Sequence, residues 1–391
     1  MKKLCCLLFL SFLFLSLRPP IQAISSDSRF IVKYDSRISR IERLKIKKEI
    51  EAKVERQIDK LDAEVLTVKG ETENKLSRLR RDSRVLYVEP DFVATTLEVS
   101  NDPAALDQTQ WALWKIQAAG TGVSAWNYTH STSSIKIGIL DTGIDQDHED
   151  LSSKIVENQN CTDSPTVDDL YGHGTHVAGI AGAITNNGIG VAGVGFDVAL
   201  ANYKSLGDSG SGYYSWIADC IVRAADGGVK VINMSLGGPN KSKTLENAIN
   251  YAWNKGVVLV AAAGNSGNSS PTYPAYYKNV IAVAATDQSD KKASFSSYGK
   301  WVDVAAPGVS IYSTFPNHSY RIGKNLNYDF ASGTSMATPV VSGLAALVWS
   351  SGSPNNIQVR NQTERTSDRI SGTGRYWIYG RVNAFRAVTK N

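Results

Sequence analysis

Short apolar runs alternate with longer helical patterns over the C-terminal two thirds of this 391-residue chain. The short runs are typical of strands buried on both faces of a sheet, and apolar residues spaced three to four positions apart predict helices. We expect strands at 135–140, 198–204, 229–234, 257–262, 280–284 and 301–305, and helices at 173–184, 213–226, 244–255, 335–350 and 382–389. This alternation predicts an α/β fold with a parallel, doubly wound sheet that has helices on both faces. Ligands of such sheets bind beyond the carboxyl ends of the strands.

One serine stands at the start of the most apolar helical segment. Residues 333–339 read GTSMATP and lead into an apolar run, so that Ser335 lies in the first turn of the expected helix. Unpaired backbone N–H groups and the positive end of the helix dipole would then lie beside its hydroxyl. Gly333 would let another backbone approach, and Pro339 is expected to be tolerated because first-turn N–H groups have no partner within the helix. By itself, the stretch is explained at least as well by an N-cap serine as by a nucleophile.

Two further motifs supply the groups that a nucleophilic serine needs. Asp141 opens the sequence DTGID directly after the expected strand 135–140, and His173 opens HGTHVAG at the start of an expected helix. Alone, they would be a turn aspartate and a polar residue at a helix start. With Ser335 they form a complete set, because an imidazole can take the serine proton near neutral pH and a carboxylate can orient the imidazole.

These three motifs, in the order Asp…His…Ser, resemble those of the subtilisin family of serine proteases from about residue 101 to the C-terminus. The resemblance implies a subtilisin-like fold and an endopeptidase whose triad of Ser335, His173 and Asp141 works through an acyl-enzyme. It also implies an oxyanion hole formed by Asn265 and the Ser335 N–H, although Asn265 could instead be a turn residue.

His176 follows His173 by three positions. We expect His176 to be a packing or support residue, because a His-x-x-His metal site would need further ligands that the sequence does not supply.

The resemblance also implies two segments that grip an extended peptide from either side by strand addition. The residues concerned are Gly210, Ser211 and Gly212 in one segment and Ser235, Leu236 and Gly237 in the other. The first pocket would be walled by Ser235–Gly237 together with Ala262, Ala263 and Gly264, with Thr272 near its base. These residues carry no charge, so we expect apolar or large neutral side chains to be preferred. The glycines could alternatively be ordinary turns, and the Tyr273-Pro274 bond would be cis by the same resemblance.

Structural calcium is the cofactor that the resemblance implies. The match is closest to the thermitase-like branch, through the loop at 184–191 and the stretch TYPAYY at 272–277. The implied ligands are the side chains of Asp102, Asp150 and Asn187 and the carbonyl groups of Ile184, Ile189 and Val191. The two acids could instead be ordinary surface residues, and a second calcium site within 163–169 is a weaker expectation.

The N-terminal quarter of the chain has a different character. Two lysines, an apolar run at 4–17 and a small-residue end predict a secretory signal at 1–23 and a secreted, extracellular protein. Residues 24–97 are charged, with expected strands at 29–34 and 85–90 and expected helices at 38–61 and 71–81. This segment is a small α+β domain of unknown purpose or, because YVEPD at 87–91 resembles the family's pro-domains, a folding assistant and intramolecular inhibitor. Cleavage would then fall at 95–100 and leave 98–391 as the peptidase domain.

The net charge of +5 does not indicate a nucleic-acid partner. Residues 1–97 hold 20 of the 42 Lys and Arg residues but only 14 of the 37 Asp and Glu residues, so the remaining chain is close to neutral. No later segment is a candidate membrane span. The expected partners are protein or peptide substrates and the chain's own pro-domain, and the enzyme is expected to be a monomer.

Two of the four cysteines, Cys161 and Cys220, lie outside the expected signal. A disulfide and two separate buried thiols both remain open.

Two other functional classes also remain: an acyl-transfer relative of the ligase or macrocyclase type, and a catalytically silent peptide-binding protein.

Overall fold

The computed structural model describes residues 27–70, 72–92 and 99–389. The chain divides into two compact units, Met1–Ala94 and Thr95–Asn391. The expected signal at 1–23 and most of the expected cleavage region, 95–98, lie outside the described residues. In the part of the chain that is described, no helix is both long and apolar enough to cross a membrane.

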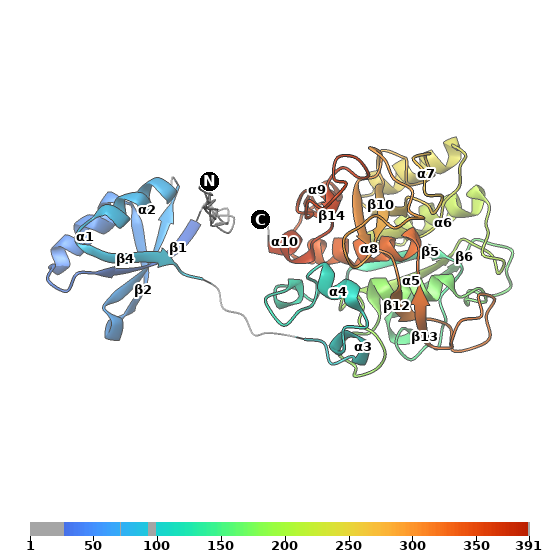
Figure 1. The fold of residues 1–391 in the computed structure, drawn as a ribbon, viewed down its shortest axis with the longest axis horizontal. Helices are drawn as coiled ribbons and strands as arrows, with labels where there is room; N and C mark the ends of the chain where they lie inside the picture. Colours follow the sequence, from blue (N-terminus) through green and yellow to red (C-terminus); the bar gives the residue numbers. More distant parts are fainter. Residues whose placement is uncertain (1–26, 71, 93–98, 390–391) are drawn as a thin grey trace, which may run out of the picture. The chain divides into compact units, whose positions relative to one another are not determined.

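The N-terminal unit is a four-stranded antiparallel sheet with two helices (Figure 1). Its elements are β1 (Asp27–Tyr34), α1 (Arg40–Glu49), β2 (Ala52–Ile58), β3 (Ala63–Lys69), α2 (Thr72–Arg81) and β4 (Val85–Pro90), and the strand order is β2-β3-β1-β4. Inward-facing residues such as Phe30, Val32 and Leu66 pack with Ile46 of α1 and Leu79 of α2.

The prediction of a single helix at 38–61 is wrong. The helix ends at Glu49, and Glu51 takes a positive φ of 53° before β2 begins. Most residues of β2 are exposed, so the strand makes few apolar contacts. Its composition is charged and typical of a helix, but pairing with β3 stabilises it as a strand.

The C-terminal unit is built around an eight-stranded sheet in which all neighbouring strands run parallel. The strands are β5 (Lys136–Asp141), β6 (Ile155–Asn160), β7 (Ala199–Lys204), β8 (Val231–Met234), β9 (Val258–Ala262), β10 (Ile281–Thr286), β11 (Val304–Pro307) and β14 (Gly380–Arg381), in the order β14-β11-β10-β9-β8-β5-β7-β6. From β5 the chain first builds outward to β6 and β7 and then continues on the opposite side with β8. The predicted doubly wound sheet is confirmed, and its switch point lies beside β5.

Helices cover both faces of this sheet (Figure 1). Successive strand residues point to opposite faces. Ile139 therefore belongs to the cluster that contains α5 (His173–Gly182) and α8 (Thr334–Ser350), whereas Leu140 belongs to the cluster that contains α6 (Tyr214–Asp226) and α7 (Lys243–Asn254). The short α10 (Ala384–Thr389) lies on the α8 side. The helices expected in the C-terminal unit match the observed ones within two residues at each end.

Several elements were not expected from the sequence. They include β3, β6, β14, the short helices α3 (Pro103–Leu106) and α4 (Trp111–Lys115), the helix α9 (Asn356–Arg365) and a hairpin of β12 (Ile311–Thr314) and β13 (Tyr328–Ala331). β6 is an edge strand whose polar residues remain half-exposed, so it lacks the apolar run that identified the central strands. The strand expected at 301–305 begins three residues later, as β11.

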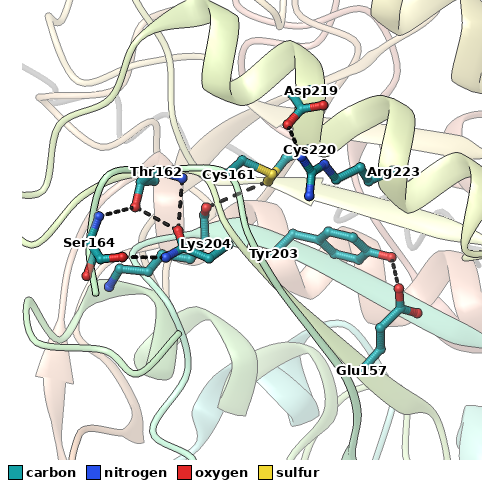
Figure 2. The surroundings of a disulfide bond; sticks show 10 residues. Glu157, Cys161, Thr162, Ser164, Tyr203, Lys204, Asp219, Cys220 and Arg223 are labelled. Atoms are coloured by element: carbon teal, nitrogen blue, oxygen red, sulfur yellow. Dashed lines mark hydrogen bonds and ion pairs between the residues drawn. A yellow bond between two sulfur atoms is a disulfide. The ribbon is translucent and has the colours of Figure 1, made fainter. Parts of the chain in front are cut away.

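Cys161, directly after β6, and Cys220 in α6 form a disulfide, with their Cα atoms 5.9 Å apart (Figure 2). The structure thereby decides between the two possibilities that the sequence left open.

Candidate active site

Four functional candidates lie at the carboxyl edge of the sheet. Asp141 is the last residue of β5, Ser235 directly follows β8, and Asn265 follows β9 by three positions. Ser335 joins them from the first turn of α8. Because all these strands are parallel, their carboxyl ends meet at one edge, as expected for an α/β ligand site.

Asp141 and His173 form a close pair. His173 Nδ1 lies 2.7 Å from Asp141 Oδ1, and the Asp141 side chain is fully buried whereas that of His173 is 21% exposed. Burial lowers the pKa of His173, but the charge and hydrogen bond of Asp141 outweigh that effect, so the pKa is raised above its ordinary value. Asp141 therefore orients the ring by holding Nδ1 and leaves Nε2 available.

Ser335 is half-buried and exchanges hydrogen bonds with Ser235. The Ser335 hydroxyl donates to the Ser235 carbonyl at 3.1 Å, and the Ser235 hydroxyl donates to the Ser335 carbonyl at 2.8 Å. The expectation that Pro339 lies in the first turn is wrong, because α8 begins at Thr334 and Pro339 is its sixth residue. Pro339 has no N–H for the Ser335 carbonyl four positions earlier, and Ser235 supplies the missing donor.

Within residues 99–389, the structure gives no hydrogen bond between His173 and Ser335. Helices α5 and α8 share one hydrophobic core, so the two side chains start from neighbouring helices. Hydrogen bonds between catalytic groups are often long without substrate and shorten in the substrate complex.

Asn265 is exposed and is fixed by the residue next to Ser335. Its Oδ1 accepts hydrogen bonds from the N–H and the hydroxyl of Thr334, both at 2.9 Å. These contacts occupy the amide oxygen and leave the Nδ2 donor for a ligand. A Cβ placed on Gly333 would lie 3.4 Å from Nδ2, so this donor faces the start of α8.

The segments expected to form the first substrate pocket come together around Thr272. A Cβ on Gly237 would lie 2.6 Å from Thr272 Cγ2, and one on Gly264 would lie 2.9 Å from Thr272 Oγ1. Glycine is required at both positions because any side chain would meet Thr272. The bond Tyr273-Pro274 is cis, as the resemblance implied.

The other expected binding segment lies after the end of β7 and packs against Tyr171 and Leu206. Gly210 has a φ of 81°, and a Cβ there would lie 2.3 Å from the ring of Tyr171. The Ser211 carbonyl accepts from the Gly207 N–H at 2.9 Å, which folds the segment into a turn. Leu206, shortly before the 210–212 segment, and Leu236, within the 235–237 segment, belong to the same hydrophobic cluster.

The residues expected to hold calcium converge on the loop after α5. Asp102 and Asp150 are both fully buried, so they are not surface acids. Asp102 accepts from the N–H groups of Asn186, Asn187 and Gly188 at 2.8–3.1 Å. Asp150 accepts from Asn187 Nδ2 at 2.8 Å and from the Val191 N–H at 2.9 Å.

The two buried carboxylates and the side-chain amide of Asn187 supply oxygen donors of the kind that Ca²⁺ prefers. The donor chemistry therefore fits the ion. The assignment of the carbonyl groups of Ile184, Ile189 and Val191 as further ligands remains an expectation.

His176 is buried inside α5, and its Nε2 lies 3.1 Å from the Ile311 carbonyl of the β12–β13 hairpin. Burial lowers the pKa of His176 to about 3, so the ring is neutral and donates this hydrogen bond. These contacts are those of a support residue.

The acids at 163–169 do not form one cluster. Asp169 is fully buried and accepts hydrogen bonds, whereas Asp168 lies with Asp145 and His318, with one ligand atom of each within 4.8 Å of the others. The contacts of Asp169 and of the fully buried Lys204 with Thr142 were not predicted from the sequence, because they join residues 27 and 62 positions apart. No local motif indicates such contacts.

A parallel α/β sheet with an Asp–His pair, a helix-start serine and an amide donor at its carboxyl edge defines a serine hydrolase. Comparison with known proteins agrees. A model of the subtilase family matches residues 132–379, and a model of the fervidolysin N-terminal prodomain matches residues 28–91. The chain belongs to the subtilase family and is a serine endopeptidase with an N-terminal prodomain.

Among its relatives, the thermophilic serine proteinase of Bacillus sp. (strain AK1) is 43% identical over 362 residues, which cover 92% of this chain and 86% of the relative. Thermitase of Thermoactinomyces vulgaris is 50% identical over 290 residues, covering 74% and 98%. A solved protease structure from Pseudoalteromonas arctica has a TM-score of 0.66 at 29% identity and covers 75% of this chain and 99% of its own. Subtilases generally bind structural calcium.

Proposed function

We propose that this protein is a secreted, autoprocessed endopeptidase that cleaves peptide bonds through Ser335, His173 and Asp141. The observation that carries the proposal is the 2.7 Å contact between His173 Nδ1 and Asp141 Oδ1, with Ser335 at the start of the neighbouring helix. The contact fixes one ring nitrogen and leaves the other to act as the base.

In the proposed reaction, the Ser335 hydroxyl turns from the Ser235 carbonyl toward His173 Nε2 when substrate binds. Nε2 takes the proton as Oγ attacks the scissile carbonyl, and later gives it to the leaving amine. The Asn265 Nδ2 and the Ser335 N–H donate to the developing oxyanion. Water then attacks the acyl-enzyme carbonyl while His173 Nε2 takes its proton. The imidazole passes that proton to Ser335 Oγ as the carboxylic acid product leaves.

For the substrate, we propose an extended peptide held between 210–212 and 235–237. The first pocket, walled by 235–237 and 262–264 over Thr272, has no charged lining residue and takes apolar or large neutral side chains. The 210–212 turn and the segment after β8 would offer backbone groups to the peptide.

We further propose that residues 1–23 are a signal peptide, that 24–97 act as folding assistant and inhibitor, and that 98–391 form the monomeric mature enzyme. The prodomain match at 28–91 supports the second assignment. The Cys161–Cys220 disulfide supports an oxidising, extracellular location.

Calcium would be structural, held by Asp102, Asp150 and Asn187 with carbonyl groups of Ile184, Ile189 and Val191. It would neutralise the two buried carboxylates and fix the 184–191 loop against the segment around Asp102.

The decisive test is Ser335→Ala in the full chain. We expect no peptide hydrolysis, no labelling by a fluorophosphonate probe and no cleavage near Leu97. Cleavage of the purified variant would contradict autoprocessing, and turnover would contradict the triad. Product masses distinguish hydrolysis from acyl transfer to an amine, the alternative reaction of the same acyl-enzyme.

A further inference from the structure

One buried carboxylate fastens the loop before His173 to the strand end that carries Asp141. The Asp169 side chain is fully buried. Its Oδ1 accepts from the Thr142 hydroxyl at 2.7 Å and from the Gly172 N–H at 2.8 Å. These two partners stand directly after Asp141 and directly before His173, so a single carboxylate binds a neighbour of each.

The same contacts continue into the first turn of α5. Asp169 Oδ2 accepts both the N–H and the hydroxyl of Thr175 at 2.8 Å. The Gly174 N–H donates to the Thr142 hydroxyl oxygen at 2.9 Å. A Cβ on Gly174 would lie only 2.0 Å from the Gly143 carbonyl oxygen, so the helix start is in direct contact with the segment after β5.

Lys204, at the end of the neighbouring strand β7, fastens these two segments from the other side. Its side chain is fully buried, and Nζ donates to the carbonyl groups of Thr142 at 2.6 Å and Asp168 at 2.7 Å. Figure 2 shows Lys204 beside the Cys161–Cys220 disulfide. The Lys204 carbonyl accepts the Cys161 N–H at 3.0 Å, so the loop 161–172 is anchored at both ends.

We propose that Asp169, Thr142 and Lys204 form a clamp that positions the Asp141–His173 pair for catalysis. The proposal rests on the proposed function, because it assigns these three residues to the geometry of that pair. None of them touches the reacting atoms, so each is a positioning residue. Charge-assisted hydrogen bonds to a buried carboxylate are strong enough to hold the two segments in one arrangement.

The clamp also acts on the charge of His173. Burial lowers the pKa of the imidazole, and Asp141 raises it by charge and hydrogen bonding; Asp169 raises it further, while His176 on the same helix is neutral. Burial raises the pKa of Asp169 above its ordinary value, and hydrogen bonds from Gly172, Thr175 and Thr142 oppose that rise by stabilising the ionised carboxylate. A purely structural residue would not shift the pH profile when replaced.

The test is Asp169→Asn in the full chain after processing, with active sites titrated by a fluorophosphonate. The amide would present N–H groups to backbone donors, so we expect kcat to fall by about ten- to a hundredfold with KM within about twofold. The acid limb of kcat/KM should move to lower pH. Asp163→Asn is the matched control, since it removes an exposed charge from the same loop and should behave as the wild type. An Asp169→Asn enzyme with wild-type kcat and an unmoved acid limb would overturn the proposal.

A second pair of variants covers the case in which Asp169→Asn does not fold. Thr142→Val keeps the shape and removes the hydroxyl, and Thr142→Ser restores it. Valine should lower kcat by about tenfold and serine should recover most of the loss; equal activities would refute the clamp. Turnover by Ser335→Ala would refute the proposed function itself, whereas an inactive Ser335→Ala beside a normal Asp169→Asn would refute the clamp alone.

Discussion

Ser235 and Ser335 exchange hydrogen bonds: each hydroxyl donates to the other's backbone carbonyl, at 2.8 and 3.1 Å. Because Pro339 cannot donate to the Ser335 carbonyl, the bond from Ser235 satisfies a group that the helix leaves unpaired. The proposed nucleophile is thereby tied to the proposed substrate pocket before any substrate arrives.

Replacing Ser235 by alanine should destabilise the start of α8. The Ser335 carbonyl would lose its partner, at a cost of about 1–3 kcal/mol, which corresponds to a decrease in Tm of roughly 2–12 °C. Thermal unfolding of enzyme inactivated against autolysis measures this change. Pro339→Ala restores a backbone donor, so the Ser235→Ala change should cost less in that background; equal costs would contradict the explanation.

On the acid side, the pH dependence of kcat/KM should follow the titration of one group, His173. The imidazole must be neutral to act as a base, and its pKa is raised above the ordinary 6.5. As pH falls through that raised pKa, the ring becomes protonated and kcat/KM falls, so the midpoint should lie above 6.5. A profile that stays flat down to pH 5 would exclude His173 as the base. Asp141→Asn should lower kcat by about 10⁴-fold.

Two substitutions at Asn265 distinguish an oxyanion donor from a structural acceptor. Asn265→Asp keeps the oxygen that accepts from Thr334 but removes the N–H donors, whereas Asn265→Ala removes both. We expect kcat to fall by about 10²–10³-fold in each, with little change in KM. Full activity in the aspartate variant would show that only the contact to Thr334 matters. Asn268→Ala, at an exposed position in the same segment, serves as the control.

Removing calcium should lower thermal stability. If the ion is present at about a thousandfold over its Kd, it contributes about 4 kcal/mol, equivalent to roughly 8–16 °C in Tm. Asp102→Asn should lower Tm and make it insensitive to a chelator, whereas Asp107→Asn, at an exposed position nearby, should retain the chelator response. An unchanged Tm of the wild type in chelator would contradict the calcium assignment.

Loss of the Cys161–Cys220 disulfide should also lower Tm. The bond joins residues 59 positions apart, and a loop of that size predicts a contribution of about 4 kcal/mol, or roughly 8–16 °C in Tm. The double variant Cys161→Ala/Cys220→Ala should show this decrease and no further response to a reductant. A wild-type protein whose Tm does not change on reduction would argue against a stabilising role.

The local patterns of the sequence were sufficient for the central part of the fold. Runs such as 135–140 and 257–262 and the apolar helix after Ser335 carry their own signal, because a strand buried on both faces or a buried helix must be apolar throughout. The charged segment at 52–58 was misassigned for the converse reason: its strand depends on pairing with β3 rather than on apolar residues.

The sequence by itself determined the sheet class, the positions of Asp141, His173 and Ser335, and the family to which their motifs belong. Only the tertiary structure decided that Cys161 and Cys220 pair, that Ser235 satisfies the Ser335 carbonyl, and that Asp169 and Lys204 both bind the residue after Asp141. The physical reason is the range of the interactions. The apolar pattern of a buried strand or helix involves residues close together in the sequence. These hydrogen bonds instead join groups 27, 62 and 100 positions apart, which meet only when the sheet has formed.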